Sequence, residues 1–185
     1  YIRTPLDAFE IDMSGVNIYP GFIDSWYEIK RKTKNKNIDD HWNENIRANY
    51  RAKTDLNIKK KELDRLHSLG IIAAHIVPEK GILKGNSDLI ILDNEFNSLS
   101  KNIAQVIEFK TGNWSDRTYP NSLLGVIALL RQTFMDARWY MQSNQIIEKF
   151  PDMNEPIFKN PSLESLEDNI MNQKPVLFMT REEHG

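Results

Sequence analysis

The sequence predicts an α/β fold in which helices alternate with buried strands. Leucines spaced along Leu56–Leu69 predict a helix that Gly70 ends, and the apolar, β-branched run Ile71–Val77 after it predicts a buried strand. The strongest helix signal covers Asn121–Phe150, where apolar residues recur at helical spacing. Helix, glycine and fully apolar strand in this order are typical of a parallel sheet covered by helices.

Shorter segments supply the other expected elements. Apolar or alternating runs predict strands at Ala8–Met13, from Phe22 to Asp24, and at Ser87–Leu92, Ile103–Phe109 and Lys174–Thr180. A second helix is expected over Ser162–Met171, with a weak cap. Two loops are expected, a long polar one over residues 30–57 and a glycine-containing one over Pro78–Asn86.

The composition is that of a soluble globular domain. The 185 residues are 40% hydrophobic and 27% charged, enough for one domain with a core. A formal net charge of -2 gives no reason to expect a nucleic acid as partner, and the basic runs read as solvated surface. The absence of cysteine excludes disulfides, thiolate zinc sites and a cysteine nucleophile. No apolar stretch approaches the roughly 18 residues of a transmembrane segment.

One motif carries a family resemblance. In the stretch Asp12–Asp24, Gly15 provides a turn, Pro20-Gly21 a sharp crossing, and Phe22 begins an apolar entry. The run from Pro20 to Asp24 resembles the segment by which metal-dependent amidohydrolases pass from an N-terminal β-sandwich into the first strand of a (β/α)8 TIM-type barrel.

The resemblance implies a domain organisation. Residues 1–19 would be the end of the sandwich, and residues 20–185 the first part of the barrel, with strands 1–3. The helices and strands predicted after Asp24 follow one another in the order that such a barrel would require. The variant that the chain resembles is an imidazolonepropionase-like, bacterial group with degenerate metal sites, which points to a periplasmic or exported protein. The first residues, Tyr1–Asp7, do not look like a native start, so we expect a fragment of a longer precursor.

The resemblance also places a metal site. Amidohydrolases carry His-x-His after the strand-entry aspartate, and residues i and i+2 of a strand point the same way, so both histidines can hold one zinc or other divalent ion. Here the two positions are Trp26 and Glu28. An indole cannot ligate a metal and would fill the space instead. Glu28 is therefore the one candidate metal ligand, unless it is a surface carboxylate, and Asp24 is expected to accept hydrogen bonds near the first strand.

No other residue receives a catalytic or cofactor-binding role from the sequence. His41 is expected to be a solvated loop residue, His67 an exposed helix residue and His75 a satisfied core histidine, while His184 reads as a terminal remnant. The aromatic and polar stretch Asn113–Pro120 would either anchor a loop or bind a sugar or peptide. The acidic pairs Asp39-Asp40 and Glu182-Glu183 are adjacent in sequence and would point apart on a strand.

These observations leave three functional hypotheses. The first is an amidohydrolase-like hydrolase that acts on non-peptide C–N bonds of a small-molecule substrate, with a degenerate metal site. The second is a catalytically inactive homologue that serves as a binding or assembly subunit. The third is an unrelated α/β protein in which Pro20–Asp24 is only a turn. Three strands cannot close a barrel, which needs about eight, so under the first two hypotheses another chain or segment would complete it.

Overall fold

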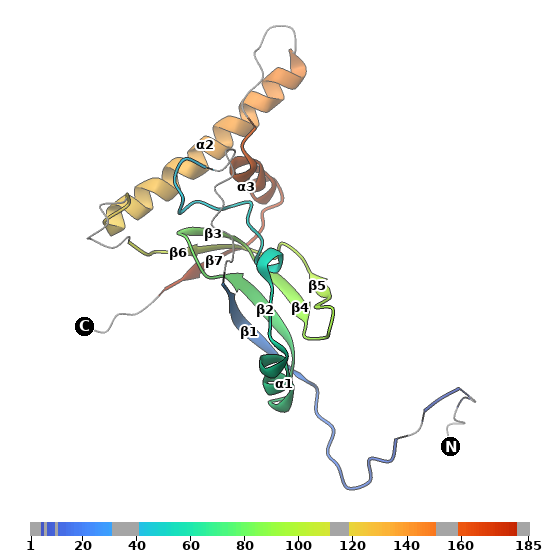
Figure 1. Cartoon of the computed structure of the whole chain (residues 1–185). Helices are drawn as coiled ribbons and strands as arrows, with labels where there is room; N and C mark the ends of the chain where they lie inside the picture. The colour runs from blue at the N-terminus through green and yellow to red at the C-terminus, as the bar shows by residue number, and fades with distance from the viewer. Residues whose placement is uncertain are drawn as a thin grey trace.

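The computed structural model describes residues 5, 7–9, 11–30, 41–111, 119–150 and 159–180, which form a mixed α/β fold (Figure 1). The first sheet has the order β1-β2-β4-β5, with bounds Phe22–Ile29, Ile71–Pro78, Asp88–Ile91 and Ser98–Ser100. The second has the order β3-β6-β7, with bounds Leu83–Asn86, Gln105–Glu108 and Val176–Met179. The helices are α1 (Lys60–Ser68), α2 (Leu123–Lys149), α3 (Pro161–Met171) and a short 3-10 turn, η1 (Ala52–Asp55).

Each sheet contains one parallel pair of strands, where the sequence predicted one parallel sheet. β1 pairs with β2 in parallel, and β6 pairs with β7 in parallel. The pairs β2–β4, β4–β5 and β3–β6 are antiparallel. Within the described ranges the strands therefore form two mixed sheets and do not close into a barrel.

The first sheet is covered on one face by α1. Ala74 and Ile76 of β2 pack in one buried cluster with Leu63 and Leu66 of the helix. The helix begins four residues later than predicted and ends as expected, because Gly70 takes a φ of +78° that suits glycine after a helix end.

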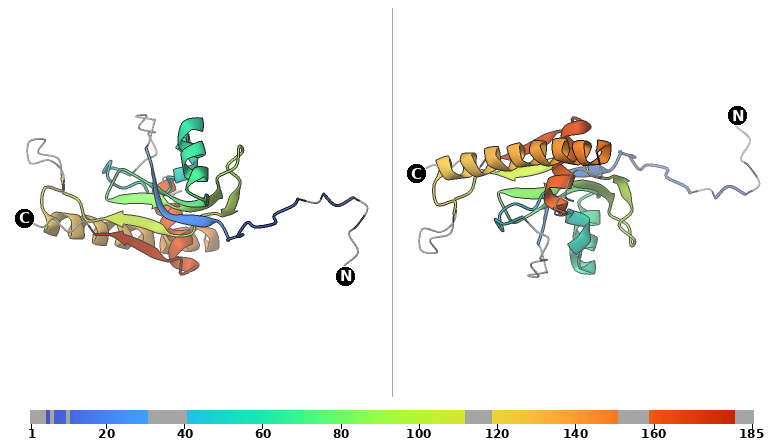
Figure 2. Two further views of the ribbon diagram at one scale, coloured as in Figure 1. Left: turned by 90° about the horizontal axis from the view of Figure 1, so that it is seen from below. Right: turned by 90° about the horizontal axis from the view of Figure 1, so that it is seen from above.

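The second sheet is covered by α2 and α3, on the side of the strands away from α1 (Figure 2). Ile107 of β6 belongs to a second buried cluster with Val126 and Leu129 of α2 and Leu166 of α3. Each helix has a side-chain cap, because Ser122 Oγ accepts a hydrogen bond from Gly125 N and Asn160 Oδ1 accepts one from Leu163 N.

The face that α2 buries differs from the predicted one. Of the apolar residues that predicted the helix, Leu130 and Ala137 are buried, but Leu123, Leu124 and Ile127 are exposed, Leu124 to 80%. The helix is apolar on more than one side, and the sheet covers only one of them. Periodicity alone could not tell which stripe faces the core.

The described part of the expected polar loop, from residue 41 on, packs against both sheets. Ile46 bridges to β3 and is fully buried, and Arg51 bridges to Asn86. The carbonyl oxygen of Ala48 accepts hydrogen bonds from three side chains. The donors are Asn86 Nδ2 at 2.9 Å, Gln105 Nε2 at 2.8 Å and Ser165 Oγ at 2.9 Å. This one oxygen thus ties β3, β6 and α3 together.

Three strand predictions need correction. No strand forms at the described residues of Ala8–Met13; Phe9 is 91% exposed, and residues 11–21 run as an exposed chain away from the body (Figure 1). The reason is that no described strand lies beside this segment to pair with it. The assignment of residues 1–19 to a sandwich remnant stays a prediction. Conversely, the expected loop Pro78–Asn86 contains β3, and β5 lies in a segment, Ser98–Ser100, where no strand was expected. In the described part of the chain no helix is long and apolar enough to cross a bilayer.

Candidate functional site at the inner faces of the sheets

Each sheet has one face turned away from its helices, called here the inner face. Successive strand residues point to opposite sides, so the inner face of β2 carries Ala73, His75 and Val77, since Ala74 and Ile76 contact α1. On β6, Ile107 faces the helices, so Val106 and Glu108 belong to the inner face. The polar side chains on these faces are the candidate site residues.

The end of β1 holds the two residues at the predicted metal-binding positions. Trp26 Nε1 donates to Glu28 Oε1 at 3.3 Å, so the two side chains lie on the same side of the strand. Asp24 Oδ1 accepts a hydrogen bond from Trp26 N at 3.0 Å, which confirms the expected role of Asp24. Glu28 pairs with Val77 in the sheet and is half-buried. The register of β1 shifts between Asp24 and Tyr27, and this irregularity positions Trp26.

These residues do not fit a metal site by themselves. The described residues contain no group of three or more histidine, cysteine or acidic side chains that could hold an ion. Glu28 offers one carboxylate, and one of its oxygens already accepts from the indole of Trp26. An indole has no lone pair to give to a metal. The role of Glu28 as a metal ligand therefore stays a prediction. The described residues do not complete a metal site around it.

A buried ion pair lies at the carboxyl end of β6. Lys84 Nζ lies 2.6 Å from Glu108 Oε2, and the two side chains are 0% and 4% exposed. Glu108 is the last residue of β6 and pairs with Met179, the last residue of β7. Lys84 Nζ also lies 3.4 Å from Met179 Sδ. Burying one of these charges alone would cost several kcal/mol, so each side chain depends on the other.

Backbone irregularity next to Lys84 explains how a lysine reaches this position. The register between β3 and β6 shifts between Leu83 and Gly85, which brackets Lys84. Gly85 has a φ of +118°, and a Cβ there would collide with the carbonyl oxygen of Tyr50. Only glycine permits this close approach, and the resulting bulge turns the lysine toward Glu108.

The Lys84–Glu108 pair was not predicted, although the sequence carries two signals for it. Glu108 directly follows Val106 and Ile107, and Lys84 follows Ile82 and Leu83 between two glycines. A lone charge inside an apolar run often means a buried partner. The partners are 24 positions apart in sequence, and without the register of β3 and β6 they cannot be matched.

A second buried carboxylate serves the packing of the chain. Asp88 at the start of β4 is fully buried, and its Oδ1 lies 2.9 Å from Arg51 Nη2. The same oxygen accepts a hydrogen bond from Asn102 N at 2.9 Å. Arg51 follows the packed segment 41–50, so this pair fastens that segment to the first sheet.

The histidines lie apart from one another. His41 is 5% exposed, contrary to the expected solvated position, and its Nδ1 accepts from Asn43 N at 3.1 Å. Burial lowers the pKa of His41 below its usual value. His67 is exposed, as predicted, and its Nε2 lies 2.6 Å from the Leu92 carbonyl oxygen. His75 Nδ1 contacts the Ser25 carbonyl oxygen at 3.1 Å, but its buried Nε2 has no partner among the described residues, so the prediction of a satisfied histidine holds for one nitrogen.

Several predicted residues fall outside the described part of the chain. They are His184, the pairs Asp39-Asp40 and Glu182-Glu183, and most of Asn113–Pro120. Tyr119 of that last stretch is described. Its ring stacks on Trp42 with centroids 6.3 Å apart, and its carbonyl oxygen accepts from Asn43 Nδ2 at 3.1 Å. These two contacts join Tyr119 to the segment 41–50.

Comparison with known proteins gives one informative structural likeness. No family model and no curated protein sequence matches the chain. The fold is similar to the crystal structure of an amidohydrolase from Thermotoga maritima MSB8, with a TM-score of 0.71 and 16% sequence identity. The match covers 94% of this chain and 50% of the Thermotoga chain, so this chain spans about half the length of that protein. At this identity the likeness concerns the fold: the chain has an amidohydrolase-like arrangement of strands and helices.

Proposed function

We propose that this chain forms the first part of an amidohydrolase-like hydrolase that acts on C–N bonds other than peptide bonds in a small-molecule substrate. One observation carries the proposal: a fold similar to half of an amidohydrolase has a buried ion pair, Lys84–Glu108, on its inner face. The finer assignment, to an imidazolonepropionase-like group with a (β/α)8 barrel, rests on the motif from Pro20 to Asp24.

Because both side chains are buried, the Lys84–Glu108 pair would not contact the substrate directly. It would act through its electrostatic field and by holding β3 and the carboxyl end of β6 together. A fixed ammonium and carboxylate in a low-dielectric interior influence charge nearby more strongly than they would in water. Both are thus positioning residues. The groups that contact the substrate would come from the other strands of the proposed barrel, or from residues outside the described ranges.

Removing the charges of the pair tests the proposal. We expect Lys84→Met combined with Glu108→Leu to keep the fold and to lower kcat for hydrolysis of a cyclic amide by about tenfold, with little change in KM. The matched control removes an exposed pair on α1, with Glu62→Leu and Arg65→Met, and leaves kcat unchanged. An equal effect of the two double variants would contradict a role of the inner pair in the site.

A second candidate is a catalytically inactive homologue that serves as a binding or assembly subunit. The contact between Trp26 and Glu28 favours it, because an indole occupies the position of one expected ligand and engages the other. Elemental analysis of the full-length protein for zinc, manganese and iron separates the two candidates. About one ion per chain supports the hydrolase, whereas no ion together with no turnover of cyclic amides supports the binding role.

Both candidates include a partner that completes the barrel, either another chain or another segment. Apolar surface supports this part of the proposal: Leu124 and Trp139 are exposed on α2, and Phe178 is exposed on β7, where its ring stacks on Phe109. Within the described residues β7 has a neighbour on one side only. Light scattering would contradict a completing partner if the isolated 185-residue chain were a monodisperse monomer with a cooperative melting transition.

A further inference from the structure

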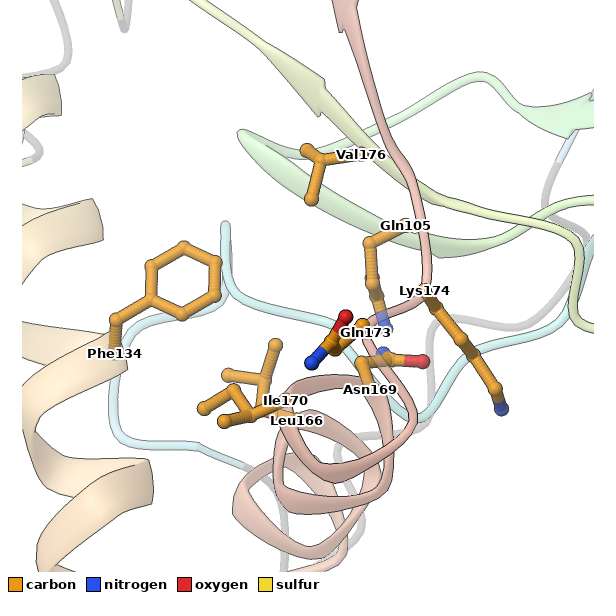
Figure 3. Close-up of a pocket in the computed structure, with 8 residues that line it drawn as sticks. All are labelled: Gln105, Phe134, Leu166, Asn169, Ile170, Gln173, Lys174 and Val176. Atoms are coloured by element: carbon orange, nitrogen blue, oxygen red, sulfur yellow. The ribbon is translucent and has the colours of Figure 1, made fainter.

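A pocket of about 210 Å³ lies between α2, α3 and the beginnings of β6 and β7 (Figure 3). Its walls include four apolar side chains, from Phe134 of α2, Leu166 and Ile170 of α3, and Val176 of β7. It lies at the amino ends of β6 and β7, whereas Glu108 and Met179 lie at their carboxyl ends. The pocket is therefore distinct from the inner-face site described above.

Two buried amide groups line this pocket with unused hydrogen-bonding capacity. Gln105 is 1% exposed; its Nε2 donates to the Ala48 carbonyl oxygen, but among the described residues its Oε1 has no partner. Asn169 is 8% exposed, and its Nδ2 likewise has no partner within the described chain. In Figure 3 the side chain of Gln105 extends toward the end of α3, where Asn169 lies. The pocket thus offers one buried acceptor and one buried donor.

The charged side chain at the pocket is already neutralised. Lys174 Nζ lies 2.5 Å from Asp168 Oδ2, and in Figure 3 its ammonium group points away from Phe134. A ligand in the pocket would therefore meet apolar walls, the two buried amides and the exposed amide of Gln173, and no unpaired charge from these residues. A buried polar group without a partner is costly, so a ligand that satisfies both amides gains from doing so.

We propose that this pocket binds a small neutral molecule that carries a carboxamide. The ligand carbonyl oxygen accepts from Asn169 Nδ2, and its N–H donates to Gln105 Oε1, while its apolar body contacts Phe134 and Ile170. The corresponding carboxylic acid is ionised at neutral pH and has no donor for Gln105 Oε1. The site therefore selects the amide over the acid. This inference stands apart from the proposed hydrolase, because binding here requires no turnover.

Benzamide and benzoate are the matched probes, since they differ in the group that the two amides would recognise. We expect benzamide, titrated into the full chain in whichever assembly it is purified, to shift the side-chain NH2 resonances of Gln105 and Asn169 in ¹H–¹⁵N spectra. Benzoate at the same concentrations should leave them in place. Asn169→Leu should weaken benzamide binding by about tenfold, since it removes the donor.

Asn172→Leu is the matched control, because Asn172 ends the same helix, lies outside the pocket lining and uses its Nδ2 on Asp168. It should leave the affinity for benzamide unchanged. Equal binding of benzamide and benzoate, or unchanged affinity in Asn169→Leu, would show a merely apolar pocket and overturn the proposal. Absence of any benzamide-induced shift would overturn it as well, and would leave water as the partner of the two amides.

Discussion

The ends of β1 and β6 present two polar pairs on inner faces, and the two pairs are built differently. At β1, Trp26 and Glu28 are half-buried and share one hydrogen bond of 3.3 Å between an indole and a carboxylate. At β6, Lys84 and Glu108 form a salt bridge of 2.6 Å from which solvent is excluded. Both pairs lie beside a shift in strand register. An irregularity in strand register can thus position a side chain either for a half-buried hydrogen bond or for a buried salt bridge. The burial of the pair decides how strongly the stability of the protein depends on it.

The largest expected effect comes from breaking the buried pair. Lys84→Met leaves Glu108 without its cation in the interior and should lower the free energy of unfolding by about 4 kcal/mol. Adding Glu108→Leu to that variant should restore most of the loss, since neither charge of the pair then remains. Urea denaturation of the two variants measures both values. A double variant no more stable than the single one would mean that the pair does more than neutralise two charges.

Gly85→Ala tests the backbone that presents Lys84. A Cβ at this glycine meets the Tyr50 carbonyl oxygen, and the φ of +118° is strained for alanine, so we expect a loss of about 3 kcal/mol in unfolding free energy. Gly15 has a positive φ but open space around it. Gly15→Ala should therefore cost about 1 kcal/mol or less, and a loss at Gly15 as large as that at Gly85 would argue against the close approach to Tyr50.

A pH-dependent effect of intermediate size is expected at His41. Because burial lowers its pKa, the unfolded chain takes up the proton first as the pH falls below about 6.5. The contribution of His41 to the free energy of unfolding is therefore fully present above that pH. It is lost progressively below it, until the pH reaches the pKa of His41 in the folded state. Unfolding at pH about 7.5 and about 5.5 should differ by up to about 1 kcal/mol more in the wild type than in His41→Asn. An identical pH dependence in both proteins would exclude His41 as the source.

The smallest effect is expected at the β1 pair. Glu28→Gln keeps an oxygen that can accept from Trp26 Nε1, so the unfolding free energy should change by less than about 0.5 kcal/mol. The tryptophan fluorescence maximum should likewise stay in place. A loss comparable to that of Lys84→Met would erase the contrast between the two pairs, and would mean that Glu28 has a further partner.

Local patterns were sufficient to predict most elements of the fold, because apolar periodicity and glycine stops act within a few residues. The helix before Gly70, the parallel strand after it and both later helices follow from such patterns. What failed depends on distant neighbours. The alternation at Ala8–Met13 has no described strand to pair with, and the exposed stripe of α2 was as apolar as the buried one.

The candidate site was less predictable than the fold for the same reason. The motif from Pro20 to Asp24 led to Trp26 and Glu28, because strand alternation relates residues two positions apart. No comparable rule relates Lys84 to Glu108, or Gln105 to Asn169. The Lys84–Glu108 contact arises from the register of β3 on β6, and the pocket that Gln105 and Asn169 line arises from the docking of α3. Neither arrangement follows from a fixed spacing in the sequence.

The carbonyl of Ala48 has a consequence for how this protein tolerates mutation. Three elements converge on an atom that every amino acid possesses, so no substitution at position 48 can delete the acceptor itself. The side chain there has only to remain small, since it is completely enclosed. The three donors, by contrast, are each replaceable and each lost by a single codon change. Over evolutionary time the three donor side chains should therefore be lost one by one, while the carbonyl acceptor at position 48 remains.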